Sequence, residues 1–374
     1  MKYETLLPNY GRSILNIPNS FLKHYGIKPY HNDIPELSNI LNKKEYKNIV
    51  FIVFDAMSSF ALDNNISKDS FLRKHKIMDL TSIFPSTTGS AYTTLVSGLS
   101  PVEHGWLGWH CYFKEYGHSI ELFKNKDFYT KEFLYPPNIA NNILGYEDVN
   151  ERIKRKSKKP ISTYNIIPEF GRGIEVVEEI FLNIKDLCRL PEKKHIFAYW
   201  DNPDSIMHKT GCISKEVSEV VTEINNKLEK ATNENEDTLF VVTADHGQID
   251  IQDFIFINEI PELQKFIEFP PSFHERAMNF MLKPGTEDFF KEKFIEILSE
   301  DDFILVQKND YIKNFLGPGI PHKKINDFVG NYVAISIGNK VPIYKNSEND
   351  LIKLKKAYHA GLTKQEMLVP LIVC

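Results

Sequence analysis

Three short apolar runs stand out along the chain, at residues 48–54, 195–200 and 238–243, and each has the length of one strand. Apolar residues at successive positions, without alternation, are typical of strands buried on both faces of a sheet. Residues 171–187 and 216–231 instead carry apolar side chains at helical spacing. The pattern predicts an α/β fold whose central sheet is mostly parallel and flanked by helices.

The pattern changes between residues 261 and 340, where shorter elements are expected. The predicted strands there are 277–282, 303–307 and 332–337, and the predicted helix is 287–298, with Phe289, Phe290, Phe294 and Ile295 facing inward. A last apolar run at 368–373 predicts a strand that rejoins the main sheet. We therefore expect a core of residues 1–260 and 341–374 and a small inserted α+β lobe of residues 261–340. Residues 111–160 are aromatic and lysine-rich, and their weak periodicity predicts no particular elements.

A hydroxyl-rich stretch, residues 81–98, is expected to run from a turn into a helix. Phe84-Pro85 ends the preceding element, because proline disfavours helical geometry in the residue before it. Ser86, Thr87 and Thr88 then follow, with small residues behind them. A hydroxyl at a helix start lies beside unpaired amides and in the positive field of the helix dipole, which suits a nucleophile that attacks phosphorus. The alternative is a Ser/Thr helix cap without chemistry.

Carboxylates and histidines follow the apolar runs. Asp55 comes directly after the first run, and it is either a helix N-cap or a functional group. Asp204 and His208 follow the second run at i, i+4, a spacing that places both on one helical face near a single ion; the alternative is a capping aspartate with a surface histidine. Asp245-His246-Gly247 follows the third, and aspartate and histidine are both good ligands for zinc or manganese. The natural use of such a set is to hold two divalent ions around a phosphoryl group.

Composition narrows the functional classes. The chain has 374 residues, a net charge of -5 and ordinary fractions of hydrophobic (42%) and charged (25%) residues, which argues against a nucleic-acid-coating surface. The basic run 152–159 is interpreted as a solvated loop or helix end. Four scattered cysteines fit free thiols in a reducing compartment. Neither a signal peptide nor a membrane span is apparent, so we expect a cytoplasmic protein that does not bind membranes.

The motifs, taken in order, resemble the type I phosphodiesterase/nucleotide pyrophosphatase family of the alkaline phosphatase superfamily. The resemblance is carried by Asp55 after its strand, Phe84-Pro-Ser-Thr-Thr88 through Ser97-Gly98, His104-Gly105, Pro203-Asp204 with His208, Thr243-Ala-Asp245-His246-Gly247 and His359-Ala-Gly-Leu-Thr. It implies an alkaline phosphatase-like core and a phosphodiesterase or nucleotide pyrophosphatase that acts on a small phosphodiester or nucleotide. Tyr10-Gly-Arg-Ser-Ile-Leu-Asn also resembles a cytoplasmic bacterial branch of the family.

The resemblance also implies roles for single residues. One metal ion would be held by Asp55, Thr88, Asp245 and His246, and the other by Asp204, His208 and His359. Thr88 would be the nucleophile that forms a threonyl-phosphate, which water then hydrolyses. Thr88 is preferred over Thr87 because its distance to Ser97-Gly98 matches the family's nucleophile. Zinc is the expected metal, and manganese is the alternative.

The sequence departs from the family at one position. Secreted and eukaryotic members carry an asparagine shortly after the His-Gly pair, where this chain has Trp109. Trp109 is expected either to line the substrate pocket or to pack in the core. Arg276 either contacts a substrate phosphate or forms a surface salt bridge. Three alternatives to the diesterase stay open: a phosphomonoesterase, a phosphomutase and a metal-binding sensor without catalysis.

Overall fold

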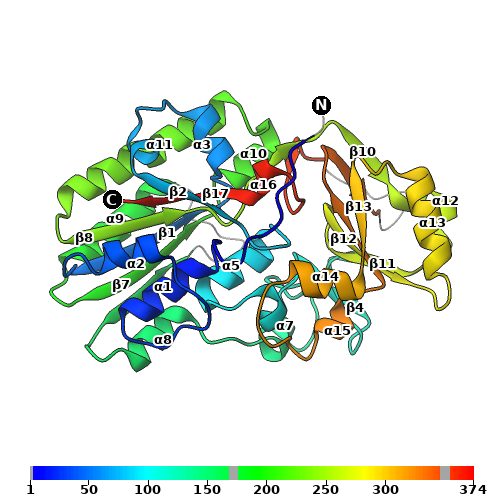
Figure 1. Cartoon of the computed structure of the whole chain (residues 1–374), viewed down its shortest axis with the longest axis horizontal. Coiled ribbons are helices and arrows are strands. Elements are labelled where there is room, and N and C mark those ends of the chain that lie inside the picture. The colour runs from blue at the N-terminus through cyan, green and yellow to red at the C-terminus, as the bar shows by residue number, and fades with distance from the viewer. Residues whose placement is uncertain (1–2, 168–175, 346–353) are drawn as a thin grey trace.

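The computed structural model describes residues 3–167, 176–345 and 354–374, and it contains two large sheets that lie side by side (Figure 1). The central sheet has six strands in the order β2-β17-β8-β1-β7-β6. They are β2 (Lys76–Thr81), β17 (Leu368–Val373), β8 (Thr238–Thr243), β1 (Asn48–Phe54), β7 (Lys194–Trp200) and β6 (Ser162–Ile166). Strands β8, β1, β7 and β6 are parallel, and β17 is antiparallel to both of its neighbours. The predicted α/β class with a mostly parallel central sheet is confirmed.

The three apolar runs form the middle of this sheet. Every residue of β1, β7 and β8 is buried, as expected for strands covered on both faces. The register pairs Phe54 with Trp200 and Val53 with Thr243. The carboxyl ends of the three strands are therefore level, and the residues that follow them emerge at one edge of the sheet.

Helices cover both faces of the central sheet (Figure 1). On one face lie α1 (Asn16–His24), α2 (Pro35–Leu41), α5 (Thr88–Ser97) and α8 (Val149–Lys156); on the other lie α3 (Ser59–Asn65), α4 (Phe71–Lys74), α9 (Val177–Arg189), α10 (Asp204–Thr210) and α11 (Lys215–Glu234). Two short helices, α6 (Pro101–His104) and α16 (Lys364–Met367), complete this part. The predicted helix at 171–187 falls partly on residues 168–175, outside the described residues, and its described part belongs to α9.

The second sheet is antiparallel, with seven strands in the order β13-β14-β12-β11-β3-β4-β5. They are β13 (Phe303–Gln307), β14 (Tyr332–Ser336), β12 (Ala277–Leu282), β11 (Ile267–His274), β3 (His110–Phe113), β4 (His118–Glu121) and β5 (Lys126–Asp127). Its helices are α7 (Ile139–Ile143), η1 (Ile257–Glu259), α12 (Pro261–Gln264), α13 (Glu287–Ile297), α14 (Lys308–Phe315) and α15 (Ile325–Phe328). Three of the strands come from residues 110–127, for which the sequence predicted no elements. The proposed division into a core and a 261–340 lobe stays a prediction.

The expected inward face of α13 is partly wrong. Phe290 and Phe294 are buried, but Phe289 is 61% exposed and Ile295 is 42% exposed. Phe290 and Phe294 are one turn apart and pack on the sheet around Phe280, whereas the two exposed side chains lie about 100° around the helix from them.

Two further two-stranded ladders are formed by the segments that connect β8 with β11 and β14 with β17 along the chain. They pair β10 (Asp253–Phe256) with β15 (Lys340–Ile343), and β9 (Ile249–Asp250) with β16 (Ala357–Tyr358). The second ladder brings the segment after β8 next to the segment that carries His359. Among the helices formed by the described residues, none has the length and apolar character needed to cross a membrane.

Candidate active site

Three aspartates meet at the carboxyl edge of the central sheet. Asp55 follows β1 directly, Asp245 lies two residues beyond β8, and Asp204 opens α10 after β7. Asp55 does not cap the next helix, because the N-cap of α3 is Ser58. The side chains of Asp55 and Asp245 are almost fully buried. Buried carboxylates need compensation by charge or hydrogen bonding, so this edge is a candidate site for cations.

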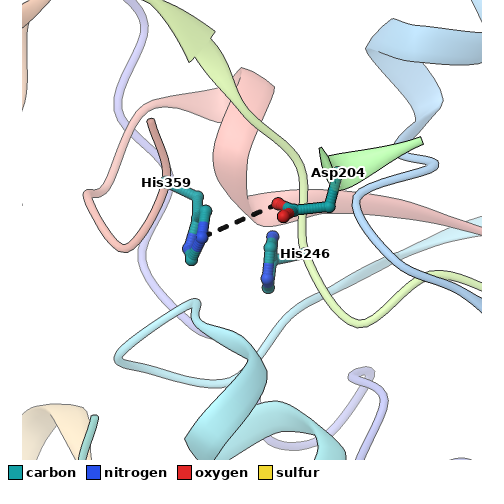
Figure 2. Close-up of side chains that lie close together, drawn as sticks. All are labelled: Asp204, His246 and His359. Atoms are coloured by element: carbon teal, nitrogen blue, oxygen red, sulfur yellow. Dashed lines mark ion pairs between the residues drawn. The ribbon is translucent and has the colours of Figure 1, made fainter. Parts of the chain in front are cut away.

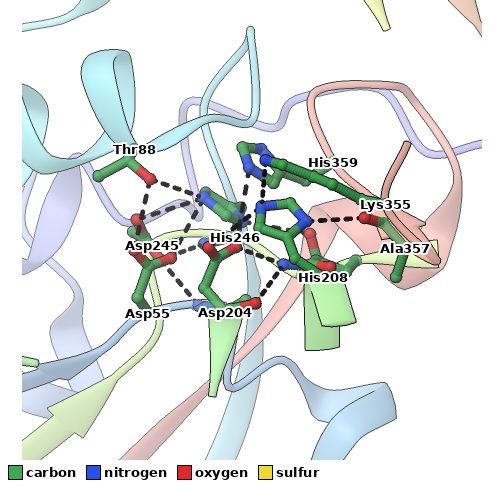
Figure 3. Close-up of polar contacts among 12 residues, drawn as sticks. Asp55, Thr88, Asp204, His208, Asp245, His246, Lys355, Ala357 and His359 are labelled. Carbon is green, nitrogen blue, oxygen red and sulfur yellow. Dashed lines mark hydrogen bonds and ion pairs between the residues drawn. The ribbon is translucent and has the colours of Figure 1, made fainter. Parts of the chain in front are cut away.

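The first group consists of Asp55, Asp245 and His246, whose ligand atoms all lie within 4.8 Å of one another. His246 Nε2 is 3.4 Å from Asp55 Oδ1 and 3.5 Å from Asp245 Oδ2. Thr88, the first residue of α5, places its Oγ1 3.4 Å from Asp55 Oδ2 and 3.3 Å from His246 Nε2 (Figure 3). The structure thus brings together the four residues predicted for one metal ion.

Hydrogen bonds hold the two carboxylates so that one oxygen of each is free. Asp245 Oδ1 accepts the backbone N–H of Ala56 (3.1 Å) and of His246 (2.9 Å), and Asp55 Oδ2 accepts the hydroxyl of Tyr199. Asp55 Oδ1 and Asp245 Oδ2 are buried and have no hydrogen-bond partner among the described residues. These two oxygens therefore fit a bound cation, which would supply the missing partner.

Burial also perturbs the acidity of the carboxylates. The pKa of Asp55 is raised well above its ordinary value by burial and by the negative charges of Asp245 and Asp204. Burial, helped by the charge of Asp204, raises the pKa of Asp245 to about 7. Clustered, desolvated carboxylates disfavour their own ionised forms, and a divalent cation would reverse this by neutralising them.

The second group consists of Asp204, His246 and His359. His359 Nε2 lies 3.7 Å from Asp204 Oδ1 (Figure 2), and the rings of His246 and His359 stack at 4.0 Å. His208, one turn after Asp204 in α10, places its Nε2 3.2 Å from Asp204 Oδ2 and 3.0 Å from the amine of Lys355 (Figure 3). The three residues predicted for the second ion are thus neighbours, with His246 shared between the groups and His208 at the rim.

All three histidines present the same ring nitrogen to the carboxylates. Their Nδ1 atoms lie against backbone carbonyls: that of Ala357 for His208 (2.7 Å), Gly247 for His246 (3.2 Å) and Ser86 for His359 (3.3 Å). A proton on Nδ1 donates to each carbonyl and leaves the Nε2 lone pair facing the aspartates. Metal-binding histidines are commonly oriented in this way.

The start of α5 is packed tightly against the second sheet. A Cβ on Gly89 would lie 2.0 Å from the carbonyl oxygen of Gly108, which precedes β3, so no side chain fits between this first helical turn and that backbone. The next residue, Trp109, donates its backbone N–H to Phe273 (2.9 Å) and is half-buried. Its ring packs beside Phe123, and Lys124 Nζ lies 5.1 Å from the ring centre. Trp109 thus lies near the hydroxyl-bearing helix start, and its role in substrate binding stays a prediction.

The sequence interpretation of Arg276 needs correction, because its side chain is fully buried and its guanidinium is bonded within the protein. Its guanidinium forms a bidentate salt bridge with Glu366 (2.7 Å for each bond) and donates to the carbonyls of Gly338 and Lys340. Four of its five N–H donors are bonded within the protein interior, so both the surface salt bridge and the substrate contact are wrong.

Several residues at the site were not found from the sequence. Tyr199 is the one with a usable signal, since a tyrosine in a fully buried strand needs a partner for its hydroxyl. Gln248 donates to Asp204, and Lys355 contacts His208. His274 packs its ring 4.6 Å from that of His359. Each of these contacts joins segments far apart in the chain, so no local pattern indicates them.

Comparison with known proteins fits this geometry. The family model of type I phosphodiesterases / nucleotide pyrophosphatases matches residues 49–309. The fold is similar to murine ectonucleotide pyrophosphatase/phosphodiesterase 5, with a TM-score of 0.62, 17% identity, and coverage of 86% of this chain and 87% of that chain. An inactive variant of that protein has been solved in complex with AMP. Phosphonoacetate hydrolase from Sinorhizobium meliloti 1021, in complex with phosphonoformate, gives a TM-score of 0.64 at 15% identity and covers 88% of this chain and 90% of that chain.

No curated protein matches the sequence at a significant level. The structural likenesses are too distant in sequence to show more than the fold, but the family model covers well over half of the chain. The chain therefore belongs to the type I phosphodiesterase/nucleotide pyrophosphatase family, whose members are hydrolases of phosphoester bonds.

Proposed function

We propose that the protein is a phosphodiesterase or nucleotide pyrophosphatase that uses two divalent metal ions and forms a phosphate ester on Thr88. The observation that carries the proposal is the position of the Thr88 hydroxyl. It lies at the start of a helix, 3.3–3.4 Å from His246 and Asp55, beside buried carboxylate oxygens that have no hydrogen-bond partner in the described part of the chain. An anionic phosphoryl group is favoured at a helix N-terminus.

We assign ligand residues to each of the two ions from the donor atoms that lie close together. Asp55, Thr88, Asp245 and His246 would hold one ion, and Asp204, His208 and His359 would hold the other. The mixed carboxylate and imidazole donors suit zinc, and manganese is the alternative. When bound, the ions would lower the pKa of a coordinated hydroxyl or water and neutralise the charge that develops on the phosphoryl oxygens.

The residues of the chain then perform the transfer. Thr88 loses its proton to solvent, and its Oγ1 forms a bond to phosphorus while the bond from phosphorus to the leaving oxygen breaks and that oxygen keeps the electron pair. Water next attacks the threonyl-phosphate, and Thr88 leaves and regains a proton. The net result is one ester or anhydride bond hydrolysed per water consumed. Tyr199 and the Ala56 amide orient the carboxylates throughout.

A preference for diesters or pyrophosphate bonds follows from charge. A monoester carries an additional oxygen charge that needs another donor or cation. Arg276, the arginine that the sequence offered for this purpose, is buried and bonded to Glu366 and to two backbone carbonyls. Trp109 stands where relatives carry an asparagine donor, and an indole N–H is a different donor in a different position.

One observation supports the monoesterase as the second candidate. Lys355 places its amine 3.0 Å from His208 Nε2 at the rim of the site, where a cation could contact an additional phosphate charge.

The free cysteines also support a reducing compartment, and we propose a cytoplasmic location.

The test compares Thr88→Ala with Thr87→Ala, whose side chain is also buried at the same helix start. Activity on bis-p-nitrophenyl phosphate and p-nitrophenyl phosphate is measured with and without chelator, together with metal content. We expect Thr88→Ala to retain about two ions while losing several orders of magnitude in rate. An inactive Thr87→Ala beside an active Thr88→Ala would disprove the assignment, and higher efficiency on the monoester would favour the second candidate.

A further inference from the structure

A lysine-rich cavity of about 500 Å³ lies at the amino edge of the central sheet, away from the candidate active site. Three segments far apart in the sequence form most of its wall: residues 41–49 before and at the start of β1, residues 157–161 after α8, and residues 193–194 at the start of β7. One end of β1 thus borders this cavity, and the other end leads to Asp55. At about 3.3 Å per strand residue, the two places are roughly 25 Å apart.

The charge of the cavity is strongly unbalanced. Its lining contains six lysines, Lys44, Lys47, Lys158, Lys159, Lys193 and Lys194, and one acidic residue, Glu45. This contrasts with the net charge of -5 for the whole chain. The basic run at 152–159, interpreted from the sequence as a solvated segment, contributes two of these lysines to a concave surface.

The contacts of these amines do not neutralise all of the positive charge in the cavity. Lys159 and Lys193 both pair with Glu45, and Lys194 is buried and donates to backbone carbonyls and Asn48. Lys44 and Lys47 donate to carbonyl oxygens, at 3.2 and 3.3 Å, and the amine of Lys44 also lies 5.1 Å from the ring centre of Tyr46. Among the described residues, the amine of Lys158 has no hydrogen bond or ion pair. Like charges held around one cavity repel each other, and an anion bound between them would relieve that repulsion.

We propose that this cavity binds a small molecule with two or more linked phosphate groups, at a site separate from the catalytic one. The volume is in the range of small-molecule sites, roughly 300–1,000 Å³. A single carboxylate would leave most of the positive charge unmatched, whereas a polyphosphate offers several charges within the reach of flexible lysine side chains. The concave shape favours a small ligand over a nucleic-acid strand.

The test is calorimetric titration of inorganic pyrophosphate into the whole protein after EDTA treatment, at low ionic strength. The cavity contains none of the proposed metal ligands, so we expect one saturable site per chain without metal. Lys47→Glu with Lys158→Glu should weaken binding at least tenfold, because each lost charge-assisted contact is worth roughly a factor of ten or more. The matched control is Lys215→Glu with Lys291→Glu, which makes the same change of charge at exposed positions outside the cavity and should stay within twofold.

Three results would overturn the proposal: no saturable binding, equal loss in both double variants, or tighter binding of a single-stranded oligonucleotide than of pyrophosphate at the same lysines. If the double variant fails to fold, Lys158→Gln alone, at an exposed position, should still weaken binding severalfold. Turnover of bis-p-nitrophenyl phosphate by the cavity variant should stay within twofold of the unmodified enzyme. This separates failure here from failure of the proposed catalytic function, which depends on Thr88.

Discussion

Removing the buried salt bridge between Arg276 and Glu366 should strongly destabilise the fold. Both side chains are 0% exposed, and both guanidinium–carboxylate bonds measure 2.7 Å. Glu366 also accepts the backbone N–H of Gly361 and the hydroxyl of Thr363. Arg276→Met would leave the Glu366 charge buried with only neutral donors. Breaking such a pair from one side costs about 3–5 kcal/mol of unfolding free energy.

The assay is equilibrium urea unfolding of the metal-free protein, followed by circular dichroism. The control is Lys215→Met, which breaks an i, i+4 pair with Glu219 whose side chains are 86% and 64% exposed. That change should cost under about 1 kcal/mol. Arg276→Met with Glu366→Leu should recover part of the loss, because no charge is left buried, but not all, because the amide of Gly361 loses its acceptor. Equal costs for the buried and the exposed pair would refute this reasoning.

Three further predictions concern the site. His359→Ala should lower bound metal from about two ions to one and remove most activity, as measured by metal analysis and turnover; unchanged metal content would exclude His359 as a ligand. Trp109→Asn should change the ratio of kcat/KM on a diester to that on a monoester if the indole lines the pocket, and a lower melting temperature with an unchanged ratio would indicate packing alone. The raised pKa of Asp245, about 7 through burial against 3.8 ordinarily, means that the folded protein binds this proton more tightly than the unfolded chain. The stability that this proton contributes, at most roughly 4 kcal/mol, is full below about pH 4 and is lost as the pH rises through 7. Buried histidines with a lowered pKa, such as His104 and His195, have the opposite pH dependence. The measurement is therefore the difference in unfolding free energy between the metal-free protein and its Asp245→Asn variant, which should shift against the unmodified protein between pH 5 and pH 8. A difference that stays constant between pH 5 and pH 8 would contradict this reasoning.

The features predicted correctly from the sequence are those that a local pattern of residues determines. β1 and β8 occupy the predicted residues, because seven or six successive apolar-rich positions suit only a strand covered on both sides. Since parallel strands end at one edge, the aspartates that follow them were expected to converge, and they do.

Contacts between distant segments could not be predicted in the same way. Strands β3, β4 and β5 have four residues or fewer, too short for a period to be recognised, and β3 is held by pairing with β11 more than 150 residues later. The partner of Arg276 is 90 residues away, at Glu366. Arg276 lies in the short turn between β11 and β12, where a charged residue is more often at the surface, and only the packing of distant segments makes this pair buried.

The sharing of His246 constrains how two ions would occupy the site. His246 belongs to both groups, but its Nδ1 lies against the carbonyl of Gly247 (3.2 Å), which leaves the one lone pair of Nε2 for a single ion. If the first ion takes His246 together with Asp55 and Asp245, the second must rely on Asp204, His359 and His208. His208 Nε2 already faces Asp204 at 3.2 Å, but it also lies 3.0 Å from the amine of Lys355. A divalent ion and an ammonium group repel each other at such a distance. Filling the second position therefore requires Lys355 to move away from His208, and its exposed side chain, which extends from the segment before β16, has room to do so.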